Sequence, residues 1–200
     1  MTTWIFAYGS LVSPESLAST IGRVVTPGSG MHVAELSGFG RRWNYGSKVL
    51  RGDWTRSDGT PVKGGLVVSL GVAAADDESI NGVIVGVDHT ELADLDWRER
   101  AYDRVDVTAQ IRLLDSESAL PDDASSVQLY VPQPSAVERY ERHRDAGTAA
   151  IRASYHRLVD DAFAALGDTH LAWYRRTPAP DVPVADIHLD PLPSIRPTPD

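Results

Sequence analysis

The sequence predicts a single mixed α+β domain. The chain has 200 residues, of which 42% are hydrophobic, so it holds enough apolar material for one buried core. Along the chain, strand-like segments follow one another with only a few helical segments between them. A parallel α/β sheet would instead alternate strands and helices, so the order of elements favours the α+β class.

The first predicted element is a strand that leads through a tight turn into a helix. In the stretch "WIFAYGSLVSPESL", which begins at Trp4, residues 4–8 favour a strand and Gly9 ends it. Ser13-Pro14-Glu15 is typical of an N-cap, a first helical residue and an acidic first turn. Such a turn can direct several backbone N–H groups toward one point, and Gly9 leaves room for a close approach. On these residues alone, an ordinary strand-to-helix connection is favoured.

The middle of the chain predicts four strands. Residues 46–65 are polar and dotted with glycine, which indicates a mobile loop or a hairpin excursion. Residues 73–78 predict a turn between two strands. The predicted strands are residues 32–36, 39–45, 66–72 and 81–87.

A short helix is predicted after Asp88. Asp88 and Glu91 have the spacing of a capping box, and Leu92 and Leu95 give the helix an inward face. Residues 105–113 then alternate between apolar and polar side chains, which makes them the clearest strand in the chain.

The last third of the chain predicts a strand, a long helix and an extended tail. An acidic, serine-bearing loop precedes a strand at residues 127–131. Residues 149–166 have helical spacing, and Gly167 stands where a helix stop is expected. From Thr177 onward proline is frequent, so we expect residues 177–200 to be an extended tail on the body or across a neighbour, and residues 1–176 to form the domain.

Composition excludes several classes of function. The net charge of −9 and the isoelectric point near 5.1 argue against a nucleic-acid partner, and the pairs Arg41-Arg42 and Arg175-Arg176 are too short to change that expectation. The chain has no cysteine, so it has no disulfide, no thiolate metal site and no cysteine nucleophile. Without a signal-like N-terminus or an apolar span, the sequence predicts no membrane partner and a cytoplasmic location.

Common catalytic and cofactor motifs are absent. The sequence has no phosphate-binding G-x-x-x-x-G-K-[ST] motif, no dinucleotide fingerprint and no G-x-S-x-G elbow. The six histidines show no ligand spacing, so no metal and no cofactor are expected.

The remaining candidates for catalysis are carboxylates near the predicted short helix. Asp94, Asp96 and Glu99 stand just before the clearest strand. A charge run of this kind is usually a solvated helix end. Glu99, however, lies one step beyond the helix, where a partly buried carboxyl would have a raised pKa and could act as a base near neutral pH.

Three separated stretches resemble the γ-glutamylcyclotransferase-like family, which includes ChaC-type enzymes and plant avirulence-induced relatives. "FAYGSL" resembles the signature turn of the family. "INGVIVGVDHTELADLDWRERAYDRVDV" resembles its strand, short helix and glutamate segment, and "ASYHRLVDDAFAALGDTHLAWYRRT" resembles its closing helix. The resemblance covers roughly residues 4–176. It implies an α+β fold with a small mixed β-barrel or curved sheet and a few flanking helices.

The resemblance also implies roles for individual residues. Glu99 would be the catalytic base, and Tyr155 would line the substrate pocket. Family members often have glycine after the glutamate, whereas this chain has Arg100, which could pair with Glu99 or reach an anionic substrate. The other residues implied to bind substrate are Tyr8, Gly9, Ser10 and Leu11 of the turn, with Tyr102 and Arg104 from the glutamate segment.

The reaction implied is a metal-independent release of 5-oxoproline from a small γ-glutamyl amide, an acyl transfer or lyase reaction with Glu99 as general acid and base. The partner would be this small molecule, and the oligomeric state is left open. Two alternatives remain: a hydrolase in which water replaces the α-amine, and a small-molecule sensor that keeps the fold without catalysis. A carboxylate in an anion-binding pocket argues against the sensor.

Overall fold

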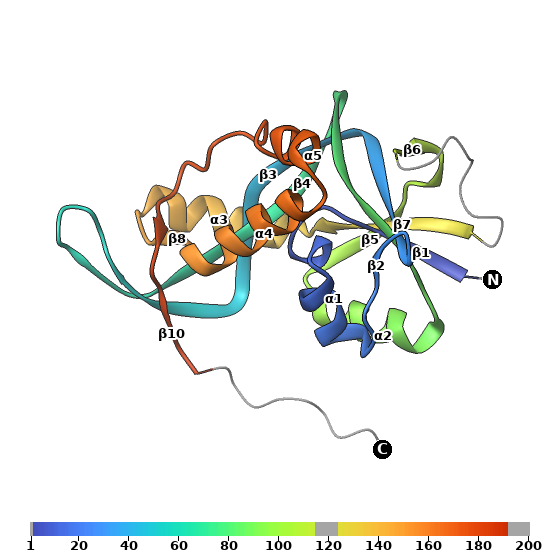
Figure 1. Ribbon diagram of the computed structural model, residues 1–200. Coiled ribbons are helices and arrows are strands. Elements are labelled where there is room, and N and C mark those ends of the chain that lie inside the picture. The colour runs from blue at the N-terminus through green and yellow to red at the C-terminus, as the bar shows by residue number, and fades with distance from the viewer. Residues whose placement is uncertain (1, 115–123, 192–200) are drawn as a thin grey trace, which may run out of the picture.

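The computed structural model describes residues 2–114 and 124–191. A large, curved and open sheet forms the centre, with its main strands in the order β10-β3-β4-β1-β7-β5 (Figure 1). The described residues hold five α-helices, and the α+β class with a curved sheet is thereby confirmed. The strands are β1 (Thr2–Ala7), β2 (Thr26–Pro27), β3 (Gly30–Thr55), β4 (Pro61–Val87), β5 (Tyr102–Asp106), β6 (Ile111–Leu113), β7 (Ala124–Pro132), β8 (Ala149–Arg152), β9 (Val184–Ala185) and β10 (His188–Leu189).

Side-chain caps begin the two helices that lie near the first turn. In α1 (Pro14–Ile21), the Ser13 hydroxyl accepts a hydrogen bond from the Ser16 N–H at 3.3 Å. In α2 (His89–Arg98), Asp88 accepts from the N–H groups of Thr90 and Glu91, and the Glu91 carboxylate accepts from the Asp88 N–H. Both predicted helix starts are confirmed, and the capping box is complete.

The long hairpin of β3 and β4 replaces the loops predicted in the middle of the chain. Residues 46–65 are its far end, so the hairpin expectation was right and the mobile loop was wrong. The turn predicted at residues 73–78 is also wrong, because both halves of β4 run on in one direction beside β3. Four residues of β4 instead bulge opposite Gly38, whose φ of +80° favours glycine. Acidic residues in a bulge have the composition of a turn.

The predicted strand at residues 105–113 is interrupted. Asp106 ends β5, and its carboxylate accepts hydrogen bonds from both the N–H and the hydroxyl of Thr108. A short 3₁₀ helix, η2 (Thr108–Gln110), follows before β6 begins. Local side-chain bonds of this kind compete with a strand, which is why the alternating pattern was misleading.

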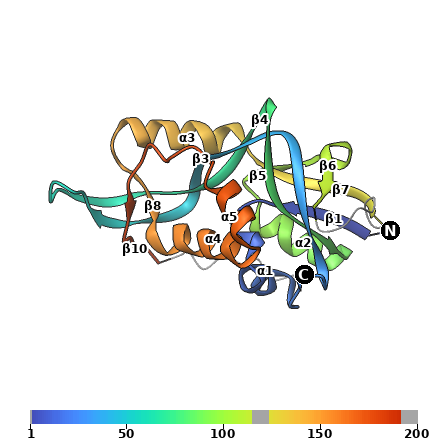
Figure 2. The same ribbon diagram turned by 45° about the horizontal axis from the view of Figure 1, so that its top comes forward.

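The helices flank the hairpin on two sides. Figure 2 shows α3 (Pro134–Asp145), which the sequence did not predict, and α4 (Ala153–Ala165) on opposite sides of β3 and β4. The predicted helix at residues 149–166 starts late, because its first residues form β8 beside residues 66–68 of β4. The short helix α5 (Asp168–Tyr174) follows α4.

The extended segment after Thr177 lies over the body of the protein (Figure 1). β9 runs parallel to β8, and β10 pairs antiparallel with β3 at Gly52, where the tail is too close for a Cβ atom. Val182, a residue of this segment, is buried against the core. Residues 115–123 of the predicted acidic loop and residues 192–200 of the tail lie outside the described residues.

Candidate active site

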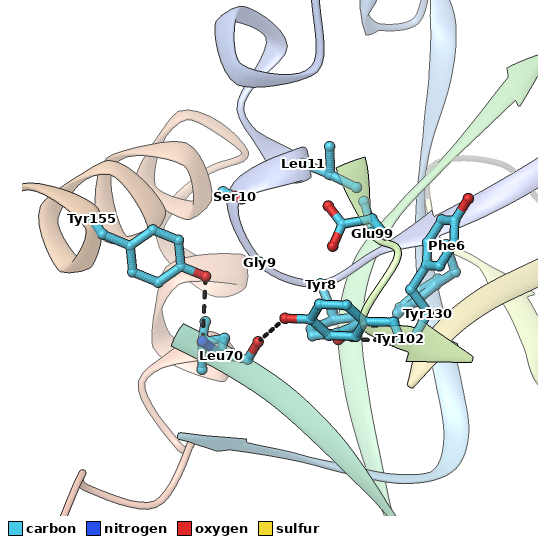
Figure 3. Close-up of a pocket in the computed structure, with 11 residues that line it drawn as sticks. Phe6, Tyr8, Gly9, Ser10, Leu11, Leu70, Glu99, Tyr102, Tyr130 and Tyr155 are labelled. Carbon is cyan, nitrogen blue, oxygen red and sulfur yellow. Dashed lines mark hydrogen bonds between the residues drawn. The ribbon is translucent and has the colours of Figure 1, made fainter. Parts of the chain in front are cut away.

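A small cavity of about 40 Å³ lies where β1 ends and the chain turns into the 3₁₀ helix η1 (Ser10–Val12). All four residues of the predicted substrate-binding turn line it: Tyr8, Gly9, Ser10 and Leu11. Glu99 and Tyr102, from the junction of α2 and β5, line it as well, and so does Tyr155 from α4. In Figure 3 the Glu99 carboxylate and the Tyr155 hydroxyl flank the turn at Gly9 and Ser10. The structure thus brings seven of the eight predicted site residues together.

The turn presents three consecutive backbone N–H groups without partners. No acceptor among the described residues binds the N–H of Gly9, Ser10 or Leu11. In a regular 3₁₀ turn, the Leu11 N–H would donate to the carbonyl of Tyr8. Here that carbonyl accepts a 3.0 Å hydrogen bond from Arg41 Nε. Consecutive free N–H groups beside a cavity form a binding place for an anion.

Arg41 is a buried support of this turn, and its side chain is not part of a surface basic patch as the sequence suggested. The residue is 2% exposed. Its guanidinium also donates to the backbone and side chain of Asn81 and to the Thr177 hydroxyl, and it lies over the rings of Phe163 and Tyr174. Burial lowers the pKa of Arg41 to about 10, so the group is still charged at neutral pH.

Glu99 ends α2 and directs a carboxylate into the cavity. Its N–H closes the helix on the Leu95 carbonyl at 2.8 Å, and its side chain is 15% exposed. Burial raises the pKa of Glu99, and the neighbouring Arg98 guanidinium acts in the opposite direction with a smaller effect. The carboxyl is therefore a stronger base than an exposed glutamate.

Arg98, rather than Arg100, pairs with this carboxylate. Arg98 Nε lies 3.1 Å from a Glu99 carboxylate oxygen. Arg100 donates instead to the Trp97 carbonyl and lies over the Trp97 ring, so of the two possibilities left open for Arg100, pairing with Glu99 is wrong.

The Arg98 guanidinium joins α2 to the turn. It donates to the hydroxyls of Ser10 and Ser16 at 3.1 Å and to the hydroxyl of Thr20 at 2.7 Å. Ser10 therefore accepts from a cation, which leaves its own hydroxyl proton free to donate. The sequence offered no signal for this role, because Arg98 and Ser10 are 88 residues apart.

Three tyrosines close the cavity. The Leu70 N–H donates to the Tyr155 hydroxyl at 3.3 Å, and the Tyr102 hydroxyl donates to the Leu70 carbonyl at 3.3 Å (Figure 3). The Tyr8 hydroxyl donates to the Tyr130 carbonyl at 2.8 Å. Burial raises the pKa of all three tyrosines, that of Tyr155 to about 12. All three hydroxyls therefore keep their protons near pH 7.

Arg104 does not line the cavity, and neither do the α2 carboxylates Asp94 and Asp96. Arg104 lies 3.4 Å from Asp96, which also accepts a hydrogen bond from the Tyr130 hydroxyl at 2.7 Å. Arg104 is thus the one predicted substrate-binding residue that the structure places elsewhere. Of the three acidic candidates on or beside α2, only Glu99 reaches the cavity.

A wider groove of about 660 Å³ adjoins the cavity. The two share Ser10, Glu99, Tyr102 and Tyr155, so the groove is the continuation of the cavity toward solvent. Among the aromatic residues of β3, Tyr45 lines the groove and stacks on Tyr102. Trp43 packs against His156, and Trp54 belongs to a separate buried cluster.

Comparison with solved structures identifies the architecture. A γ-glutamyl cyclotransferase specific to glutathione from yeast superimposes with a TM-score of 0.56 at 14% identity, over 88% of this chain and 95% of that one. The chain has the γ-glutamylcyclotransferase-like fold. A second γ-glutamyl cyclotransferase gives a TM-score of 0.52 at 14% identity, over 90% and 89% of the chains, and an uncharacterized human protein gives 0.51 at 14% identity, also over 90% and 89%. No family model matches the sequence, and no curated protein matches it.

This γ-glutamylcyclotransferase-like fold was the one that the sequence motifs implied, and the prediction is confirmed. Within residues 2–114 and 124–191, no three His, Asp or Glu side chains gather closely enough to hold a metal ion. No helix in the same residues is long and apolar enough to cross a membrane.

Proposed function

We propose that the protein is a γ-glutamyl cyclotransferase that releases 5-oxoproline and a free amine from a small γ-glutamyl amide. The observation that carries this proposal is the meeting of one buried carboxylate, Glu99, with the free N–H groups of the first turn in a single small cavity. This pairing supplies a base and an anion-binding place, the two functions that the cyclisation needs. The likeness of fold to γ-glutamyl cyclotransferases supports the same reaction class.

The reaction is an intramolecular acyl transfer. The α-amine attacks the γ-carbonyl carbon, the new C–N bond closes a five-membered ring, and the γ-amide bond breaks. Both protons that the α-ammonium loses end on the departing amine, and no water is consumed. A well-oriented intramolecular attack contributes about 7–11 kcal/mol relative to an intermolecular one, so the protein needs no nucleophile of its own.

Each group in the cavity has a part in this scheme. Glu99 accepts a proton from the α-ammonium and returns it to the leaving amine. The N–H groups of Gly9, Ser10 and Leu11 bind either the α-carboxylate or the oxyanion that forms on attack. The Tyr155 hydroxyl, which accepts from Leu70, keeps its own proton to donate to the substrate.

The test is release of 5-oxoproline from a panel of γ-glutamyl amino acids, γ-glutamyl amines and glutathione. We expect the wild type to release 5-oxoproline and Glu99→Gln to lose at least about a hundredfold in kcat, which is typical for a general base. Asp96→Asn is the matched control, because it changes a carboxylate on the same helix that does not line the cavity. Binding with no product from a folded protein would favour the sensor, and glutamate as the product would favour the hydrolase.

A further inference from the structure

The groove outside the cavity is unusually basic for this protein. The chain has a net charge of −9, yet the groove is lined by Arg98, Arg100 and Arg152. Among the described lining residues, Glu99 is the one carboxylate, and Arg98 already pairs with it. The side of the site where the leaving amine would lie therefore has two positive charges in excess.

These two arginines are not neutralised by the protein. Arg152 is half-buried at the start of α4, and no hydrogen bond, ion pair or ring contact to another described residue is found for its guanidinium. Arg100 is exposed; among the described residues its guanidinium donates a hydrogen bond to the Trp97 carbonyl and lies over the Trp97 ring, and it forms no ion pair with a carboxylate. A half-buried cation without a partner has unused hydrogen-bonding capacity.

Both arginines come from places that fix them relative to the reaction. Arg100 directly follows Glu99, and Arg152 directly precedes α4, which carries Tyr155. Glu99 and Tyr155 line the cavity and the groove alike. A group attached to the leaving nitrogen would thus pass from the cavity toward Arg100 and Arg152.

We propose that Arg100 and Arg152 form a subsite for an anionic group on the leaving amine. The inference rests on the proposed function and deepens it, because it names the substrate class: γ-glutamyl amides whose amine part carries one or more carboxylates or a phosphate. A cationic amine, such as a polyamine, would meet two uncompensated positive charges and would be rejected.

A charge series of substrates measures the preference. The leaving part of γ-glutamyl-glutamate carries two negative charges, and that of γ-glutamyl-glutamine carries one. The leaving part of γ-glutamyl-ethylamide is uncharged, and that of γ-glutamyl-putrescine carries one positive charge. We expect kcat/KM to fall in this order, by about tenfold for each arginine-to-anion hydrogen bond that is lost. γ-Glutamyl-phosphoethanolamine added to the series shows whether phosphate or carboxylate is preferred.

Two variants assign the preference to these residues. Arg100→Gln combined with Arg152→Gln should reduce kcat/KM for γ-glutamyl-glutamate and leave that for γ-glutamyl-ethylamide within about twofold, so the ratio of the two measures the subsite. Arg157→Gln is the matched control, because it removes the same charge from α4 outside the groove. The control should keep the wild-type ratio.

The outcomes separate this inference from the proposed function. If all members of the series release 5-oxoproline at similar rates, or if the double variant keeps the wild-type ratio, the anionic subsite is wrong and the cyclotransferase stands. If the folded wild type releases 5-oxoproline from none of them, the proposed function is wrong and the inference fails with it.

Discussion

At the residue scale, two opposing effects act on the pKa of Glu99. Burial favours its neutral form and raises its pKa, and Arg98 favours its charged form. A base must be ionised to accept a proton and must still bind it firmly, so both influences are useful. The burial effect is the larger one, and the acid limb of the pH profile should therefore lie above that of an ordinary glutamate.

Arg98→Gln tests this balance. Without Arg98 the pKa of Glu99 rises further, so Glu99 is protonated up to a higher pH, and the acid limb of kcat/KM should shift to higher pH. We also expect kcat to fall about tenfold, since Ser10 and the turn lose a charged donor. The measurement is a pH–rate profile of wild type, Arg98→Gln and Arg98→Lys, the last of which keeps the charge. A lower kcat with an unmoved acid limb would mean that Arg98 acts only on the structure.

The sequence motifs nominated the carboxylate and the turn but not their supports. Glu99 and the turn stand in recognisable stretches, whereas Arg98 and Arg41 act on residues far along the chain. Arg41 binds Thr177, 136 residues away, and no local pattern distinguishes a buried arginine from a surface one. Arg41-Arg42 looked like one basic pair, although only Arg42 reaches a carboxylate, that of Glu78.

At the element scale, long-range pairing decided the strands that the sequence placed wrongly. Local signals located β1, α1 and α2, because caps and turn residues act within a few positions. The acidic bulge in β4 has the local composition of a turn. The 3₁₀ break after β5 has the local composition of a strand. Their actual form depends on β3 and on a side-chain bond that composition does not reveal.

The β1–η1 connection depends on β3 through Arg41, and a paired substitution tests this. Arg41→Lys should lower the free energy of unfolding by at least about 2 kcal/mol, because a single ammonium cannot replace the separate donors that bind Tyr8, Asn81 and Thr177. Arg42→Lys, at a partly exposed ion pair with Glu78, should stay within about 1 kcal/mol. Urea denaturation measures both, and equal losses would contradict the supporting role of Arg41.

At the scale of the whole molecule, the extended segment after Thr177 connects parts of the sheet. Its strand β9 pairs with β8, and its strand β10 pairs with β3 near the far end of the long hairpin. It also buries Val182 against the core. Among the described residues, none after Thr177 lines the cavity or the adjoining groove, so we expect the segment to contribute to stability rather than to chemistry.

Two valines of this segment provide a matched test. Val182 is 7% exposed and Val184 is 44% exposed. Val182→Ala should lower the free energy of unfolding by about 2 kcal/mol through the cavity it leaves. Val184→Ala should change the free energy of unfolding by less than about 0.5 kcal/mol. Both variants should keep wild-type kcat, and equal stability losses in urea would contradict docking of the segment.

The central claim is cyclisation by the substrate's own α-amine with Glu99 as the base. The most direct measurement is the mass of the product formed from a γ-glutamyl amide in water labelled with the heavy oxygen isotope. Cyclisation predicts 5-oxoproline without solvent oxygen from the wild type, formed at least about a hundredfold more slowly by Glu99→Gln. Glutamate carrying one solvent oxygen would show that water is the nucleophile and would contradict the claim.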